Sequence, residues 1–338
     1  MWPSCRPCVL PTGLPGWRPR RGAYTSKHAY ISAAMEISIV IPVYNKAAYL
    51  ERCLASIFRQ DYDDYEIVAV DDGSTDGSAA LCDSLAAGNP HLRVVHQPNA
   101  GVTAARRRGV ETARGRYIVF VDPDDELLPG ALAAQHQAIE RTGADEVIAP
   151  YCTQHGRLRD SGWRGWVDTD VLIADLLKTH NSFAVLWSVI FKRQLLEDCL
   201  GAPRVIVERE DILMQFKCLM KKPKVYFAHR PAYCYHEGLP NDRVEDLAMV
   251  KAYDQELKAT LSPQWERWKS AYVGHQIKVY EKFVDKRQFH VLRDYYKPLR
   301  RQLSSDIPLQ DRIVIMLPPL VAYPLVHCYK QLRRLLLR

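Results

Sequence analysis

Between residues 36 and 150, apolar runs alternate with segments whose apolar side chains recur every three or four positions. The runs cover residues 37–43, 66–70, 92–95, 117–121 and 146–149, and a polar turn follows each of them. The segments with helical spacing cover residues 48–60, 78–87, 102–113 and 130–141. Strands that are apolar throughout are buried on both faces. The alternation therefore predicts an α/β fold with a mainly parallel, Rossmann-like mixed sheet flanked by helices.

The alternation stops after residue 151. Residues 151–240 are mixed and rich in aromatic side chains, and residues 244–310 have the composition of helices rich in lysine, tyrosine and leucine. We therefore predict one α/β domain over residues 36–240, divided near residue 150, and a C-terminal helical extension over residues 244–310.

The first 34 residues have proline at positions 3, 7, 11, 15 and 19, a spacing that excludes a helix. We interpret this segment as a disordered leader. Met35 stands directly before the first predicted strand and is an alternative start of translation.

Residues 311–338 form an apolar and basic tail. Its apolar run, residues 313–326, is interrupted by three prolines and is too short to span a bilayer. Residues 329–338 mix leucine with arginine, as segments at membrane surfaces do. Two interpretations stay open, because the tail can rest on anionic lipid or pack on the core of the protein.

The net charge of +7 is concentrated at the ends of the 338-residue chain. Residues 1–34 and the last eleven residues carry nine basic side chains and no acid, so the rest of the chain has 37 basic against 39 acidic residues. This distribution favours a protein whose basic tail binds an anionic surface. A protein that binds nucleic acid in a groove would carry the basic residues in its folded part. The nine cysteines are scattered and odd in number, which is typical of a protein without a disulfide framework in a reducing compartment.

The fourth apolar run leads directly into four acids within five residues, Asp122, Asp124, Asp125 and Glu126. Crowded carboxylates repel one another unless a cation offsets them, and Mg²⁺ and similar ions prefer oxygen ligands. Capping of the following helix would use one of these carboxylates but not three. The pattern therefore indicates a metal site at the end of a strand, of the kind that holds nucleotide phosphates.

Two further acidic turns have simpler explanations when each is considered alone. The turn Asp71-Asp72-Gly73-Ser74 follows the second strand and contains residues that cap helices and permit turns. Glu210 and Asp211 open a helical segment, where acids favour the helix dipole. The order of all these elements along the chain points beyond a structural role.

The complete series resembles glycosyltransferase family 2, enzymes of the GT-A fold, over roughly residues 36–240. The elements that carry the resemblance are Ile39-Val40-Ile41-Pro42-Val43-Tyr44-Asn45, Asp71-Asp72-Gly73-Ser74, Asn99-Ala100-Gly101 with Arg106, Asp122-Pro123-Asp124-Asp125 and Glu210-Asp211. It implies a nucleotide-binding half over residues 36–150 and an acceptor half over residues 151–240.

The resemblance implies roles for the donor-binding residues. Pro42, Tyr44, Asn45 and Asp72 would hold the nucleoside, and Arg106 would add a positive charge near the phosphates.

The resemblance also implies roles in metal binding and catalysis. Asp122 would lie near the ribose and the metal, and Asp124 would ligate the metal. Asp211 would be the base that takes the proton of the acceptor hydroxyl, with Glu210 orienting the acceptor or serving as the alternative base. His236 is interpreted either as a phosphate or metal contact or as a surface histidine.

These roles describe a metal-dependent, inverting glycosyltransferase. It would use Mn²⁺ or Mg²⁺ and a nucleotide sugar, with a UDP-sugar expected, and would act on a glycan or lipid-linked acceptor in surface polysaccharide or glycolipid biosynthesis. We expect it in the cytoplasm at the inner face of the cell membrane, contacting anionic lipid through its C-terminal tail and binding no nucleic acid.

Two alternatives stay open at this point. A sugar nucleotidyltransferase would share the sheet and the metal carboxylates, but residues 42–46 lack the Gly-rich loop that holds a triphosphate. A catalytically silent nucleotide-sugar-binding module would not require the intact Asp122, Asp124 and Asp211. One departure from the family pattern lies beside the predicted base, because Arg209 stands where the family often has glycine.

Overall fold

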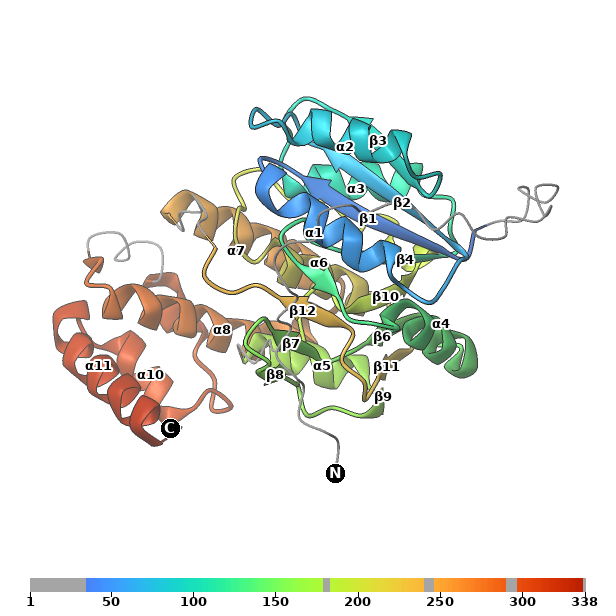
Figure 1. Ribbon diagram of the computed structural model, residues 1–338. Helices are drawn as coiled ribbons and strands as arrows, with labels where there is room; N and C mark the ends of the chain where they lie inside the picture. Colours follow the sequence, from blue (N-terminus) through green and yellow to red (C-terminus); the bar gives the residue numbers. More distant parts are fainter. Residues whose placement is uncertain (1–34, 179–182, 240–245, 290–296, 337–338) are drawn as a thin grey trace. The chain divides into compact units, whose positions relative to one another are not determined.

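The computed structural model describes residues 35–178, 183–239, 246–289 and 297–336 (Figure 1). The predicted leader therefore lies outside the described residues. Contacts between residues divide the chain into two compact units. Residues 169–178, which we had assigned to the acceptor half, belong to the second unit together with the C-terminal helices.

The first unit contains the predicted alternation of strands and helices. Its strands are β1 (Ile37–Val43), β2 (Tyr65–Asp71), β3 (Leu92–His96), β4 (Tyr117–Phe120), β5 (Glu126–Leu127), β6 (Glu146–Ile148), β7 (Tyr151–Thr153), β8 (Leu158–Arg159), β9 (Gly165–Val167), β10 (Val189–Lys192), β11 (Val225–Phe227) and β12 (Tyr233–Tyr235). Its helices are α1 (Ala47–Phe58), α2 (Ser78–Ala87), α3 (Val102–Thr112), α4 (Ala131–Thr142), the 3₁₀ helix η1 (Arg193–Leu196) and α6 (Glu210–Met220).

The main sheet has eight strands in the order β3-β2-β1-β4-β10-β6-β11-β9. Strands β3, β2, β1 and β4 are parallel, as the apolar runs predicted. Strand β10 is antiparallel to both of its neighbours, β4 and β6. The sheet is thus mixed and mainly parallel, and the carboxyl ends of β1, β2, β3 and β4 meet at one edge, where such sheets bind ligands.

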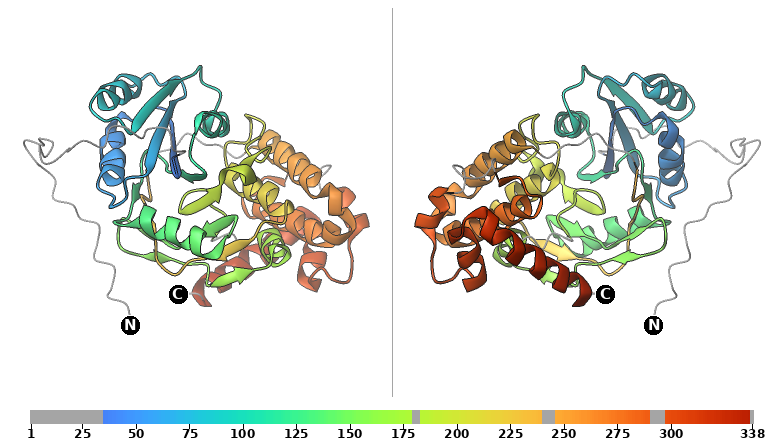
Figure 2. Two further views of the ribbon diagram at one scale, coloured as in Figure 1. Left: turned by 90° about the vertical axis from the view of Figure 1, so that its right-hand side faces the viewer. Right: turned by 90° about the vertical axis from the view of Figure 1, so that its left-hand side faces the viewer.

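Helices cover both faces of the parallel part of the sheet. Residues of α1, α2 and α4 share one buried cluster with the strands, whereas Ala105 of α3 packs with Val68 and Val70 of β2 in another. Figure 2 shows α1 and α3 on opposite sides of β1 and β2. Helix α3 lies very close to β1, because a Cβ added at Gly109 would be 2.2 Å from a methyl group of Val40.

A second sheet follows the acidic turn, with strands in the order β5-β12-β7-β8. Strand β5 begins at Glu126 and pairs antiparallel with β12, and β12 pairs parallel with β7. This pairing brings residues 233–236 next to residues 125–127, more than 100 positions earlier in the chain.

The second unit is helical. Its elements are α5 (Thr169–Leu177), α7 (Leu247–Leu261), the 3₁₀ helix η2 (Ser262–Gln264), α8 (Trp265–Asp285), the 3₁₀ helix η4 (Lys297–Gln302), α10 (Leu309–Met316) and α11 (Pro319–Leu336). Helix α8 is central and buries Val273, Ile277 and Val284 against its neighbours. Within the described ranges, each helix is too short or too polar to cross a membrane.

Candidate active site

Asp72 joins the turns that follow β2 and β3. One carboxylate oxygen, Oδ1, accepts hydrogen bonds from the Ala100 backbone N–H at 2.8 Å and from Nε2 of Gln97 at 2.7 Å. The other oxygen accepts the N–H of Gly101 at 2.8 Å. The next residue, Gly73, has φ 73°, and a Cβ there would be 2.9 Å from the Asn99 nitrogen, so only glycine fits this close approach.

Asn45 joins the turn after β1 to the turn after β2. Its backbone N–H donates to Oγ of Ser74 at 3.1 Å, and its side-chain oxygen accepts the N–H of Thr75 at 2.8 Å. Asn45 has φ 51°, in the left-handed region that asparagine tolerates better than most residues. Neighbouring Tyr44 is 46% exposed, so its ring is available to a ligand.

These turns and the acidic turn surround a cavity of about 660 Å³. A segment before α6, which includes Arg204, forms another part of its wall. Six of the predicted site residues line this cavity: Pro42, Tyr44, Asn45, Asp72, Asp122 and Asp124. A cavity of this size accommodates a nucleotide sugar.

Asp122 and Asp124 are partly exposed, and each pairs with a cation. Oδ1 of Asp122 is 3.1 Å from Nη2 of Arg106, and Oδ2 of Asp124 is 2.5 Å from Nζ of Lys46. The two side chains are 23% and 20% exposed. They offer carboxylate oxygens to the cavity, a donor set that fits a hard divalent ion whose shell is completed by phosphate oxygens and water.

Arg106 connects the acidic turn to the start of α6. Its guanidinium is 3% exposed and also donates to Oε1 of Glu210 at 3.2 Å. Burial alone would lower the pKa of Arg106, but Asp122 and Glu210 outweigh it and raise the pKa. The structure therefore brings the two predicted halves of the site together through one buried arginine. Contact between Arg106 and phosphate stays a prediction.

Glu210 and Asp211 occupy the first turn of α6. Glu210 is buried, whereas Asp211 keeps part of its surface exposed. Oδ1 of Asp211 accepts the N–H of Ile212 at 2.8 Å. Burial, followed by the negative charge of Glu210, raises the pKa of Asp211 to about 7. A carboxylate with this pKa takes up a proton near neutral pH, as a general base must.

Asp125 has a role that the sequence did not indicate. Its carboxylate does not cap the next helix, because the N-cap of α4 is Gly130 and no side chain caps it. The buried Asp125 carboxylate instead accepts the hydroxyl of Tyr233 at 2.9 Å and the backbone N–H of His236 at 2.8 Å. Burial, followed by the charge of Asp122, raises the pKa of Asp125 to about 8. Asp125 thus attaches β12 to the acidic turn.

His236 lies at the same junction. Its Nε2 is 3.0 Å from Oε1 of Glu126, which also lies 3.4 Å from Nε of Arg52. The side chain is 13% exposed, so His236 is not an ordinary surface histidine. A phosphate or metal contact for His236 stays a prediction.

A second cluster of potential metal ligands lies away from the cavity-lining residues. Glu36, His136 and Glu140 bring one ligand atom each within 4.8 Å of one another. Arg116 already pairs with both glutamates, at 4.0 Å and 2.9 Å. The protein's own cation therefore already offsets the negative charge of this cluster.

Comparisons with known proteins bear on the family of this chain. Residues 38–200 match the family model described as "Glycosyl transferase family 2". The chain is 40% identical over 116 residues to "Glycosyltransferase GlyG" of Streptococcus pneumoniae, a match that covers 34% of this chain and 38% of GlyG. It is 43% identical over 230 residues to "Uncharacterized glycosyltransferase EpsJ" of Bacillus subtilis, covering 66% of each chain.

The fold also has a solved counterpart. The crystal structure of S. aureus TarS residues 1–349 in complex with UDP-GlcNAc superimposes with a TM-score of 0.62 at 18% sequence identity, covering 88% of this chain and 92% of that one. This likeness confirms the predicted GT-A type fold. The matched relatives bear the name glycosyltransferase, in agreement with the predicted enzyme class, and this chain belongs to glycosyltransferase family 2.

Proposed function

We propose that this protein is a metal-dependent, inverting glycosyltransferase that moves a sugar from a nucleotide sugar to a hydroxyl group of a glycan or lipid-linked acceptor. The observation that carries the proposal is the ion-pair chain Asp122–Arg106–Glu210, which connects the carboxylates of the cavity to the residue beside Asp211. Donor-binding and base functions are thereby assigned to two connected groups of acids.

The donor would bind in the cavity. Pro42, Tyr44 and Asp72 line the part formed by the turns, where the nucleoside would lie. Asp122 and Asp124 would hold Mn²⁺ or Mg²⁺ together with the diphosphate. A bound divalent ion would act as a Lewis acid that stabilises the negative charge of the leaving nucleoside diphosphate. A UDP-sugar is our expected donor, supported by the UDP-GlcNAc complex of TarS, which shares the fold.

Transfer would occur in one displacement. The acceptor hydroxyl gives its proton to the Asp211 carboxylate while its oxygen forms a bond to the anomeric carbon. The bond between that carbon and the phosphate oxygen breaks, and the electron pair leaves with the nucleoside diphosphate. One base and one displacement invert the anomeric configuration. Glu210, which Arg106 holds in place, would orient the acceptor or replace Asp211 as the base.

The acceptor side has a feature specific to this chain. Arg209, the N-cap of α6, has φ 64°, in the left-handed region that favours glycine. A non-glycine residue there costs about 1 kcal/mol. Strain of this kind beside the proposed base supports a functional role, selection of an acidic or phosphorylated acceptor. Arg209→Gly and Arg209→Ala should both lose that preference, and an unchanged preference in both would contradict the role.

We also propose that the C-terminal helices contact anionic lipid at the inner face of the cell membrane. Residues 312–338 contain five basic side chains and no acid. Apolar side chains are exposed on α10 and α11: Leu309, Ile313, Met316, Leu320, Val321, Leu325 and Tyr329. Sedimentation with vesicles tests the contact. The protein should bind vesicles rich in phosphatidylglycerol, and a variant with serine at positions 320, 321 and 325 should bind them less.

Purified protein, Mn²⁺ and a panel of nucleotide sugars test the reaction class. Free UDP or GDP is measured with and without glycan and lipid-linked acceptors. We expect release with at least one donor, and release should increase with a suitable acceptor. If no donor is bound or turned over under any of these conditions, the proposed function is wrong. The biological setting, surface polysaccharide or glycolipid biosynthesis, depends on which acceptor supports transfer.

A further inference from the structure

Lys46 is the cation nearest to the proposed metal ligand Asp124. It lies between β1 and α1, where its backbone N–H donates to Oγ of Ser78 at 2.8 Å. Its Nζ lies 2.5 Å from Oδ2 of Asp124, and the two side chains are 25% and 20% exposed. Both residues line the cavity. The ammonium therefore occupies an oxygen of Asp124 at the cavity that the donor and metal would share.

The other cations that contact the acidic turn each interact with more than one partner. Arg106 is buried between Asp122 and Glu210. Arg52 pairs with Glu126 at 3.4 Å and donates to the backbone oxygen of Asp124 at 2.6 Å. Within the described parts of the chain, Asp124 is the one carboxylate in ion-pair contact with Lys46. Of these three cations, Lys46 is the one that can leave its partner most easily.

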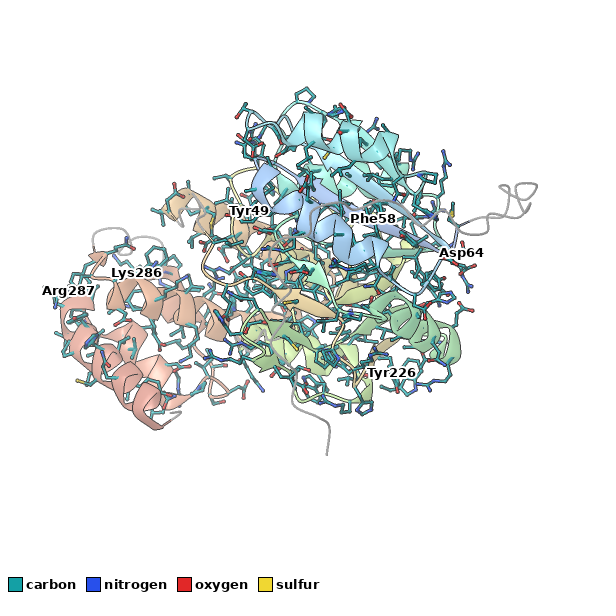
Figure 3. All side chains as sticks on the ribbon, viewed as in Figure 1. Tyr49, Phe58, Asp64, Tyr226, Lys286 and Arg287 are labelled. Atoms are coloured by element: carbon teal, nitrogen blue, oxygen red, sulfur yellow. The ribbon has the colours of Figure 1, made fainter. Side chains whose placement is uncertain are left out.

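The surroundings allow Lys46 to move. Its Nζ lies 5.6 Å from the ring centre of Tyr49, labelled in Figure 3 at one end of α1, and Arg52 lies 5.7 Å from the same ring. The flexible lysine stem can turn its ammonium from one side of the cavity to another at little cost. An ammonium at 2.5 Å and a metal ion at about 2.1 Å cannot share the same face of one carboxylate oxygen.

We propose that Lys46 is the exchangeable counter-ion of Asp124. In the metal-free protein it neutralises Asp124, and when metal and donor bind it releases the carboxylate and pairs with the diphosphate oxygens of the donor. This inference rests on the proposed function, since it uses the same metal site. It couples the two ligands, because metal alone must displace the ammonium, whereas the diphosphate gives the displaced ammonium a new partner.

The exchange is tested without turnover by measuring how tightly the protein binds Mn²⁺ alone. Electron paramagnetic resonance gives the concentration of free Mn²⁺. Lys46→Met removes the charge and keeps most of the stem. We expect the variant to bind Mn²⁺ alone about three- to tenfold more tightly than the parent protein, because the competing cation is gone. In the presence of UDP the order should reverse, with the variant binding Mn²⁺ and UDP about three- to tenfold more weakly.

Lys192→Met is the matched control. Lys192 forms a similar pair with Asp145, at 2.7 Å with side chains 29% and 30% exposed, and it does not line the cavity. This control should leave both affinities unchanged. Lys46→Gln repeats the measurement with a polar side chain in case the methionine disturbs the turn.

The outcomes separate this inference from the proposed function. If the parent protein binds Mn²⁺ with UDP, and Asp124→Asn does not, the metal site stands. Equal or weaker binding of Mn²⁺ alone to both Lys46 variants then overturns the exchange alone. If the parent protein binds no Mn²⁺ even with UDP, both the exchange and the proposed metal site are wrong.

Discussion

The two groups of acids in the site lie in different environments. Asp122 and Asp124 line a cavity and are partly exposed, and they pair with two different cations, Arg106 and Lys46. Glu210 and Asp211 begin a helix, and the positive charge of the buried Arg106 acts on both of them. The pKa of Asp211 is raised to about 7. Both groups are carboxylate pairs after short turns, so residue type does not distinguish them.

The difference shows how environment assigns chemistry. A carboxylate that reaches an open cavity is suited to holding a cation, whereas Asp211, whose pKa is raised beside the buried Glu210, is suited to taking up a proton. Arg106 allows the two environments to lie next to each other, because it offsets one acid from each group. The proposed roles can therefore be tested one group at a time.

The largest effect is expected when the proposed base is removed. Asp211→Asn should lower the transfer rate by about 10³- to 10⁴-fold, because the amide cannot accept the acceptor proton. Steady-state release of UDP in the presence of acceptor measures this loss. Asp64→Asn, at an exposed aspartate labelled in Figure 3, is the control and should keep the parental rate. Near-parental transfer by Asp211→Asn would place the base elsewhere.

Removal of Arg106, the cation that connects the two groups of acids, should lower the free energy of unfolding. Arg106→Met leaves Asp122 and Glu210 without their shared partner and should destabilise the protein by about 3–5 kcal/mol. Arg107→Met is the matched control, because Arg107 is 58% exposed and lies 3.9 Å from Glu111. It should change the free energy of unfolding by less than about 0.5 kcal/mol. Equal stabilities of the two variants in urea unfolding would show that the buried pairs contribute little.

The pH dependence of transfer follows from the raised pKa of Asp211, about 7. The base is active when deprotonated, so kcat/KM should be constant above the pKa and fall about tenfold per pH unit below it. Initial rates between pH 5 and 9 measure the profile. If the rate stays level down to pH 5, the active base has a lower pKa than Asp211 has in this structure. The residual rate of Asp211→Asn should not follow this profile.

Glu146 is a buried acid that has no part in the proposed catalysis, so it tests the effect of burial alone. Glu146 accepts a hydrogen bond from Nε2 of Gln215 on α6 at 2.6 Å, while its other oxygen and the Gln215 oxygen have no hydrogen-bond partner among the described residues. Burial raises the pKa of Glu146 to about 7. The unfolded chain loses this proton near pH 4.5 and the folded protein only near pH 7, so stability falls as pH rises across that window.

Glu146→Gln should therefore stabilise the protein above pH 7, by about 1 kcal/mol, since it removes a buried charge and keeps a hydrogen-bonding partner for Gln215. At pH 4 the substitution should have little effect. Thermal unfolding at the two pH values measures the difference. If Glu146→Gln destabilises the protein at pH 8, the charged glutamate is stabilised by more than its one hydrogen bond, and the argument from burial is wrong.

Much of the fold could be predicted from the sequence. The apolar runs at residues 37–43, 66–70, 92–95, 117–121 and 146–149 correspond to β1, β2, β3, β4 and β6, because strands buried on both faces have a strong local pattern. Strand β10 could not be placed this way, since its antiparallel pairing with β4 and β6 depends on partners distant in the chain. The two-residue strand β5 is too short for any periodicity.

For the candidate site, the sequence named residues that lie together in the structure but did not give their contacts. Pro42, Tyr44, Asn45, Asp72, Asp122 and Asp124 do line one cavity. The burial of Arg106 between two acids could not be read from a motif, because it depends on α3 lying close to α6 in space. Likewise, Lys46 lies in a turn and belongs to no motif. Its role is indicated only by Asp124, which is 78 positions later in the sequence and beside it in space.

The most direct test of the account compares donor binding in Asp124→Asn and Asp211→Asn. Calorimetric titration of UDP in the presence of Mn²⁺ measures both. We expect Asp124→Asn to lose about tenfold or more in affinity, because a carboxylate on the metal and diphosphate side is gone. Asp211→Asn should bind UDP within about twofold of the parent protein, because in the proposed mechanism its carboxylate acts on the acceptor. The opposite pattern, with donor binding lost in Asp211→Asn and kept in Asp124→Asn, would contradict the division of roles between the two groups of acids.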